Sequence, residues 1–207
     1  DFHVAPGRTV RVPTMRQTAS FAYGEAPGVQ ILEMPYRGQE LAMVIVLPTE
    51  QDGLAAVERG LTADALAAWL AAPSTSSDSG TLSPPRVAVS LPKFLIDPPS
   101  SMALGATLSA MGMPTAFDDD HADFTGIADP ADPRDRLRIS EVFHKAFVRV
   151  DEEGTEAAAA TAVVMGPGAG PPPAPPHVFQ ANHPFLFLIR DLQSGMILFL
   201  GRVTDPS

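Results

Sequence analysis

The sequence predicts an α+β fold that is built mostly from antiparallel sheets. Many runs have strand length and composition, helical segments are few, and the most apolar strands lie far apart in the chain. Residues 41–47 form a nearly continuous apolar run, which is typical of a strand that is buried on both faces. Many strands, few helices and long-range returns together favour the α+β class.

The first half of the chain predicts two neighbouring strands followed by helices. Residues 29–34 read as a strand, residues 36–39 can turn the chain, and residues 41–47 return. Residues 54–70 are predicted to be helical with a break at Gly60, because glycine weakens helices. Thr62 is a plausible N-cap of the second piece, and Trp69 is expected in the core.

The second half predicts loops, one more helix and three strands. Residues 73–85 are rich in Ser, Pro, Gly and Thr and read as a connection. We expect a strand at 86–90, a helix at 101–111, an acidic turn region at 117–135 and a long strand at 137–150. The apolar runs 185–189 and 197–203 are predicted to form a hairpin through residues 191–195.

Composition excludes several classes of function. The formal net charge of −10 argues against nucleic acid and anionic membranes as partners, and no apolar run approaches bilayer length. The chain has no cysteine, no His-Glu-x-x-His, no phosphate-binding glycine loop and no Gly-x-Ser-x-Gly turn. We therefore expect no enzyme activity, no cofactor and no metal.

Two clusters resemble active-site chemistry but are better explained structurally. Asp118, Asp119, Asp120, His121 and Asp123 could attract a hard cation, but the glycine and the final glutamate of a calcium loop are missing. The expected role is a solvated acidic loop. His144 beside Lys145 could be read as a base next to a cation, but no nucleophile accompanies it, which favours a structural histidine.

The proline- and glycine-rich stretch 166–176 cannot form a helix or a central strand. The residues after it form two apolar strands that cannot be an independent core, so the stretch is an excursion within one domain. Such exposed excursions are usually functional, and extended backbone is a good protease substrate.

The run just before that stretch consists almost entirely of small residues: Gly154, Thr155, Glu156, Ala157, Ala158, Ala159, Ala160 and Thr161. Such a segment can stay out of a sheet, because alanine favours helix over strand. It can also enter one, since tiny side chains pass their neighbours without clashing. This run and the residues 139–153 before it, with 91–94, 143–147 and 201–206, resemble the serpins, the suicide inhibitors of serine proteases.

The resemblance covers the whole chain and implies the C-terminal half of an inhibitory-type, prokaryotic-like serpin domain. A complete serpin is nearly twice as long, and the other half would hold most helices and several strands of the main sheet. The resemblance also implies an exposed reactive loop at about 154–178, whose segment after Gly154 enters that sheet once a serine protease has cut the loop. An extracellular or periplasmic location is expected.

Further residue roles are implied by the same resemblance. Lys93 and Glu152 are expected to form a salt bridge that closes the top of the main sheet, with His144 nearby. The residues from Gly154 to Gly168 extend roughly 46 Å at ~3.3 Å per residue, enough to cross a sheet. This length favours cleavage between Gly168 and Ala169, by a protease that accepts small residues before the cut.

The residues leave alternatives open for the cleaved bond and for the function. Counting backwards from Phe179 and Pro184 moves the cleaved bond towards Gly170 and Pro171, although a proline after the bond makes a poor protease site. The protein as a whole could also be a non-inhibitory serpin-fold binding module or an inactive serpin fragment. The small-residue run favours the inhibitor, because bulky or charged residues there would block entry into a sheet.

Overall fold

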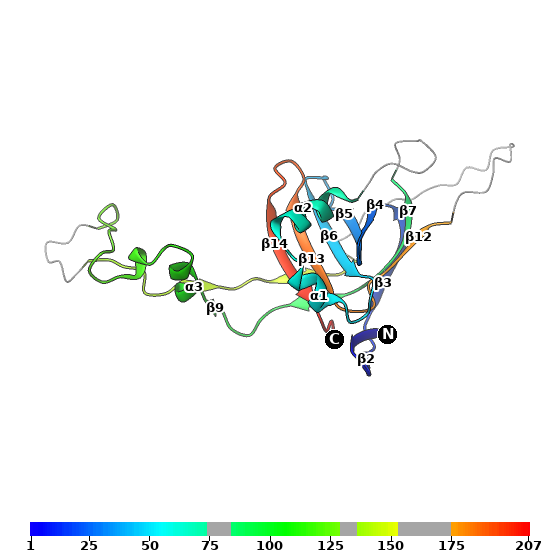
Figure 1. Cartoon of the computed structure of the whole chain (residues 1–207), viewed down its shortest axis with the longest axis horizontal. Helices are drawn as coiled ribbons and strands as arrows, with labels where there is room; N and C mark the ends of the chain where they lie inside the picture. Colours follow the sequence, from blue (N-terminus) through cyan, green and yellow to red (C-terminus); the bar gives the residue numbers. More distant parts are fainter. Residues whose placement is uncertain (74–83, 129–135, 153–174) are drawn as a thin grey trace. The chain divides into compact units, whose positions relative to one another are not determined.

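The computed structural model describes residues 1–73, 84–128, 136–152 and 175–207. The chain divides into two compact units, one formed by residues 1–95 and 149–207 and the other by residues 96–148 (Figure 1). None of the described helices has both the length and the apolar character that crossing a bilayer requires.

A five-stranded antiparallel sheet forms the core of the first unit. Its strand order is β14-β13-β6-β5-β4. The strands are β4 (Ala22–Ala26), β5 (Val29–Pro35), β6 (Leu41–Pro48), β13 (Phe185–Asp191) and β14 (Ile197–Val203). The central strand β6 is buried from Ala42 to Pro48, which confirms that this apolar run is covered on both faces.

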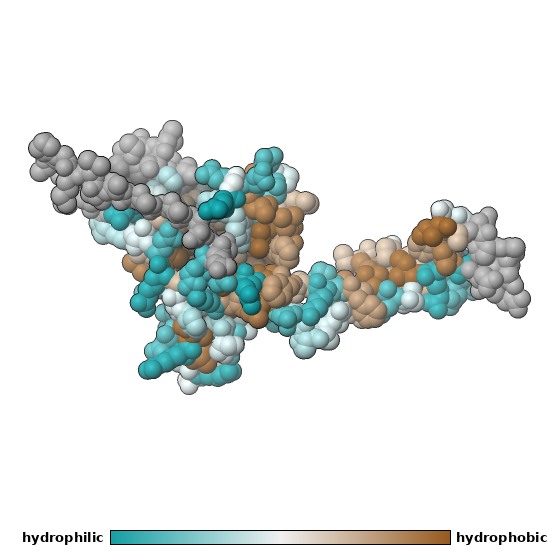
Figure 2. Space-filling model, turned by 180° about the vertical axis from the view of Figure 1, so that it is seen from behind, coloured by the Kyte–Doolittle hydropathy of each residue, from teal (hydrophilic) through white to brown (hydrophobic). Residues whose placement is uncertain are grey.

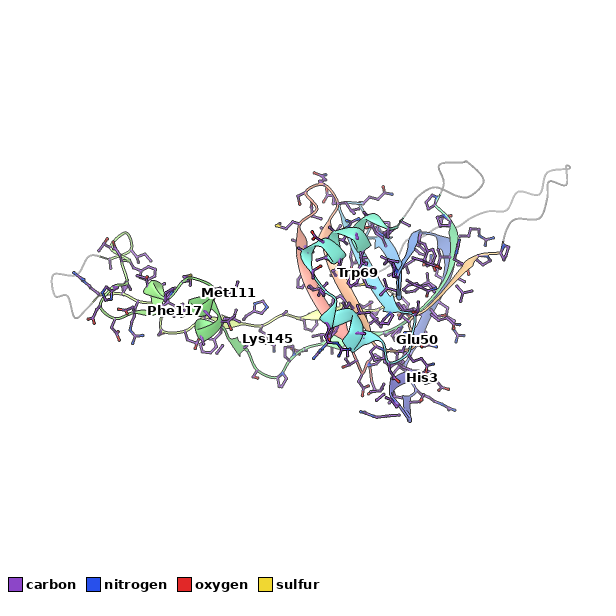
Figure 3. All side chains as sticks on the ribbon, viewed as in Figure 1. His3, Glu50, Trp69, Met111, Phe117 and Lys145 are labelled. Carbon is purple, nitrogen blue, oxygen red and sulfur yellow. The ribbon has the colours of Figure 1, made fainter. Side chains whose placement is uncertain are left out.

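Alternate side chains of β13 fill the two faces of this sheet. Leu186 and Leu188 join a cluster that also contains Leu54 and Trp69 from α1 (Leu54–Arg59) and α2 (Ala63–Ala71) (Figure 3). On the opposite face, the rings of Phe185 and Phe187 lie 6.0 and 5.3 Å from the ring of Phe94. Burying two such faces supplies most of the favourable free energy of this unit.

Local sequence signals explain the ends of these elements. The Oγ1 of Thr62 accepts a hydrogen bond from the N–H of Ala65, so the predicted N-cap of α2 is confirmed. Gly38 has φ of +92° in the turn between β5 and β6, a conformation that favours glycine. In the turn between β13 and β14, Oδ1 of Asp191 accepts from the N–H of Gln193 and of Ser194.

A three-stranded sheet of order β12-β7-β3 completes the first unit together with a hairpin. Here β7 (Arg86–Pro92) pairs antiparallel with β3 (Thr14–Ser20) and parallel with β12 (His177–Gln180). The hairpin joins β1 (Phe2–Ala5) to β2 (Arg8–Val10). Figure 1 shows β12 and β7 side by side.

The second unit contains little regular structure and few buried side chains. It holds β9 (Met102–Ala103), α3 (Gly105–Ala110), a 3-10 turn η1 (Thr115–Phe117) and β10 (Phe143–His144). Figure 2 shows apolar side chains over much of its visible surface. Several large apolar side chains of this unit are more than half exposed: Met102, Met111, Ile127, Phe143 and Phe147.

Two predicted elements of this region are wrong. The predicted strand 137–150 is two short strands, because β10 pairs with β9 whereas β11 (Val148–Val150) pairs with β8 (Phe94–Ile96). The predicted helix 101–111 is wrong at its start. The observed helix is the shorter α3, because Met102 and Ala103 form β9 and pair with β10. In both cases the available strand partner decides the local structure, and sequence patterns do not carry that information.

Candidate functional site

The residues of the expected reactive loop connect two different sheets. The expected loop, residues 154–178, begins after β11 and includes the first two residues of β12, which belongs to the three-stranded sheet. The small-residue run Gly154–Thr161 and the expected reactive bond Gly168–Ala169 lie outside the described residues. The described ends of the loop are Glu152 on one side and Pro175 on the other.

The end before the loop carries an exposed ion pair. The carboxylate of Glu152 contacts the ammonium group of Lys93, and these side chains are 61% and 38% exposed. Lys93 directly follows β7, and its backbone N–H donates to the carbonyl of Pro13 at 2.9 Å. The hydrogen bond from Lys93 lowers the pKa of Glu152, so the carboxylate is ionised at neutral pH. Exposed pairs of this kind add little stability.

An apolar cavity of about 360 Å³ adjoins Glu152. Its apolar lining comes from β3, β5 and β7 and the loops beside them: Met15, Phe21, Met34, Pro35, Val89 and Leu91. Tyr36 also lines this cavity, and its burial raises the pKa of its phenol above the ordinary value. Glu152 therefore lies between a charged partner and an apolar cavity.

His144 belongs to the second unit, whereas Lys93 and Glu152 belong to the first. It occupies β10 opposite Met102 and is exposed. Its neighbour Lys145, labelled in Figure 3, forms an ion pair of 2.9 Å with Asp97. A described ion pair joins Lys93 and Glu152, two of the three residues expected at the sheet top, and the expected place of His144 stays a prediction.

The end after the loop is held by buried groups. Phe179 of β12 is fully buried, and the N–H of Ala181 donates to the carbonyl of Ser90 at 2.9 Å. His183 is 6% exposed, and its Nε2 lies 2.8 Å from the carbonyl oxygen of Pro48. Burial lowers the pKa of His183, so Nε2 of the neutral ring donates to Pro48.

Sequence patterns gave no indication of the ring contact at the first residue of β12. The rings of His177 and Tyr23 lie 4.8 Å apart, although Tyr23 belongs to β4 of the five-stranded sheet. No motif marks either residue, because the contact arises between two different sheets.

The acidic segment 118–123 is organised by its own hydrogen bonds. Oδ1 of Asp118 accepts from the N–H of Asp120 and lies 2.8 Å from Nδ1 of His121. The contact with Asp118 raises the pKa of His121, while the pKa of Asp118 falls for the same reason. Within the described part of the chain, no three metal-ligating side chains are grouped to hold an ion.

Comparisons with known proteins agree with this architecture. A family model described as "Serpin (serine protease inhibitor)" matches residues 1–206, and that description is of an inhibitor, not an enzyme. An uncharacterized serpin-like protein of Thermococcus kodakarensis is 41% identical over 99% of the chain and 44% of its own length. Human antithrombin-III is 38% identical over 99% of the chain and 41% of its own length.

Human leukocyte elastase inhibitor is 41% identical over 94% of the chain and 49% of its own length. The chain thus spans less than half the length of each of these three relatives. The match covers the strands around the loop as well as both of its ends. The chain therefore belongs to the serpin family.

Proposed function

We propose that the protein containing this chain inhibits a serine protease as a suicide substrate. The observation that carries this proposal is the run of small residues Gly154–Thr161, which stands between β11 and β12 in a serpin sequence. Two relatives carry compatible names, antithrombin-III and leukocyte elastase inhibitor. An extracellular or periplasmic location, where such a protease would be met, is part of the proposal.

The proposed reaction uses the catalytic serine of the protease and no catalytic group of the inhibitor. The protease attacks the carbonyl carbon of the reactive bond, Gly168–Ala169, and forms an acyl-enzyme. The amine of Ala169 leaves with the proton that the protease histidine donates. The freed segment after Gly154 then adds to a sheet as a new strand and carries the acylated protease with it before water can attack the ester.

The topology is compatible with this movement. Among the described strands, β11 has β8 as its neighbour on one side, so its other edge can accept a strand. The small-residue run begins four residues after the end of β11 and can double back along it. The exposed pair of Lys93 and Glu152 precedes that run and is weak enough to open.

The test is whether the intact protein forms a covalent complex with a serine protease that cleaves after small residues. We expect a complex that survives SDS and contains the protease serine esterified to the carbonyl of Gly168, within the loop. Complete cleavage of the loop with release of active protease would instead support a non-inhibitory serpin-fold module. Absence of both cleavage and complex would support an inactive fragment.

A further inference from the structure

The strand that follows the expected reactive loop pairs with its own sheet along one edge. β12 has four residues, lies at the edge of the three-stranded sheet and, among the described strands, pairs with β7. Its pairing is parallel, which is slightly less stable per residue than antiparallel pairing. Phe179 is its one buried side chain, while Val178 is 56% exposed. Short edge strands with few buried contacts open more readily than central strands do.

A second contact holds this strand at its loop-proximal end. His177 is the first residue of β12, and its ring centroid lies 4.8 Å from that of Tyr23 with an interplanar angle of 33°. Tyr23 projects from β4, an edge strand of the other sheet. The ring pair therefore connects the three-stranded sheet to the five-stranded sheet at the start of β12.

Tyr23 is itself fixed in position by polar neighbours. Its hydroxyl donates to Oε1 of Glu25 at 2.5 Å and accepts from Nε2 of Gln30 at 3.0 Å. The side chain is buried, and β4 pairs with β5 so that Glu25 lies directly opposite Gln30. Burial and the Glu25 carboxylate both raise the pKa of Tyr23, so the phenol keeps its proton and its hydrogen bond. The ring is thus a rigid platform for His177.

We propose that Tyr23, Glu25, Gln30 and His177 form a clasp that fixes the C-terminal end of the reactive loop, with Tyr23 and His177 as positioning residues. This inference rests on the proposed function, in which one end of the loop moves and the other stays. A loop whose far end slides presents its bond to the protease less well and loses tension before cleavage. The clasp keeps β12 paired with β7, so that the movement is confined to the side of Gly154.

Amide hydrogen exchange of the intact protein, without protease, tests the clasp directly. We expect His177→Ala and Tyr23→Leu each to speed exchange of the β12 amides roughly two- to tenfold, the range that the loss of one aromatic pair gives. Exchange in β6 should not change with His177→Ala, because that side chain is exposed and lies outside the core. His177→Phe keeps a ring over Tyr23 and should restore slow exchange.

Two comparisons separate the clasp from a general loss of stability. Val178→Ala removes an exposed side chain of the same strand and should leave the exchange of β12 unchanged. The double variant of Tyr23→Leu and His177→Ala should exchange no faster than the more strongly affected single variant, because both changes remove one contact. Equal effects of His177→Ala and Val178→Ala, failure of His177→Phe to restore slow exchange, or additive effects in the double variant would overturn the proposal.

The same variants can then be mixed with a serine protease. We expect His177→Ala to yield more cleaved and less trapped protein than His177→Phe does. If no variant and no wild-type protein traps a protease, the proposed function fails, while the exchange results still decide whether the clasp exists. Equal trapping by His177→Ala and His177→Phe would show that the clasp does not position the loop.

Discussion

The described residues before and after the expected reactive loop are held in opposite ways. Before the loop, Glu152 is joined to Lys93 by an ion pair that is open to solvent. After the loop, β12 is held by the buried ring of Phe179, by the contact of His177 with Tyr23 and by the buried His183 nearby. Exposed charges separate at little cost, whereas buried apolar groups do not. The difference fits a loop that moves at its first end and stays fixed at its second.

The largest expected effect comes from changing the first end at the small-residue run. Thr155→Arg in the intact protein would require a charged side chain to pass between packed strands, which costs several kcal/mol of desolvation. We expect trapping to fall at least about tenfold, since ~1.4 kcal/mol already gives that factor, and cleavage to take its place. Densitometry of SDS gels gives the ratio of complex to cleaved protein.

Thr155→Ser, which stays small, is the matched control for this change. A Thr155→Arg protein that traps protease at the wild-type ratio would show that this run does not enter a sheet.

The next effect concerns the fixed end. Phe179→Ala removes a ring that is fully buried, and we expect the free energy of unfolding to fall by ~3–5 kcal/mol. Urea unfolding of the intact protein measures this loss. Val178→Ala, at the exposed neighbouring position, should change it by less than about 0.5 kcal/mol. Similar losses for both variants would mean that β12 is not anchored through its buried face.

A smaller effect should appear in the pH dependence of stability. Burial holds the folded-state pKa of His183 below its ordinary value of 6.5, so the unfolded chain takes up a proton more readily. The contribution of neutral His183 is therefore complete above pH 6.5 and is lost as the pH falls from there towards the folded-state pKa. His183→Gln should flatten the unfolding free energy in this window, and an unchanged pH slope would contradict the assignment.

The smallest effect is expected at the ion pair of Lys93 and Glu152. Lys93→Gln should barely change the melting temperature, because the pair is exposed. It should raise the pKa of Glu152 towards its ordinary value of 4.5, which carboxyl NMR can follow. The pair contributes above that pH, and its contribution is lost as the pH falls and the carboxylate gains a proton. Lys145→Gln breaks a pair in the other unit and should leave the Glu152 titration unchanged.

Elements that carry their own local signal were predictable. The strands β5 and β6, the helices α1 and α2 with the cap at Thr62, and the hairpin of β13 and β14 all follow from apolar period, capping and turn residues. The apolar pattern of residues 137–150 predicted one long strand, but Phe143 and Phe147 are more than half exposed and the short strands there depend on their partners. Strand prediction from apolar pattern assumes that apolar residues are buried, so it is wrong where they are exposed.

The α+β class and the serpin family could be predicted from the residues alone, because apolar runs and short motifs act through properties of their own side chains. Only the tertiary structure decided which distant groups meet. It brings the ring of His183 to the carbonyl of Pro48, and Tyr23 of one sheet to His177 of another. Such contacts depend on how strands are ordered and how sheets are placed, and pairs far apart in a chain leave no periodic trace in one sequence.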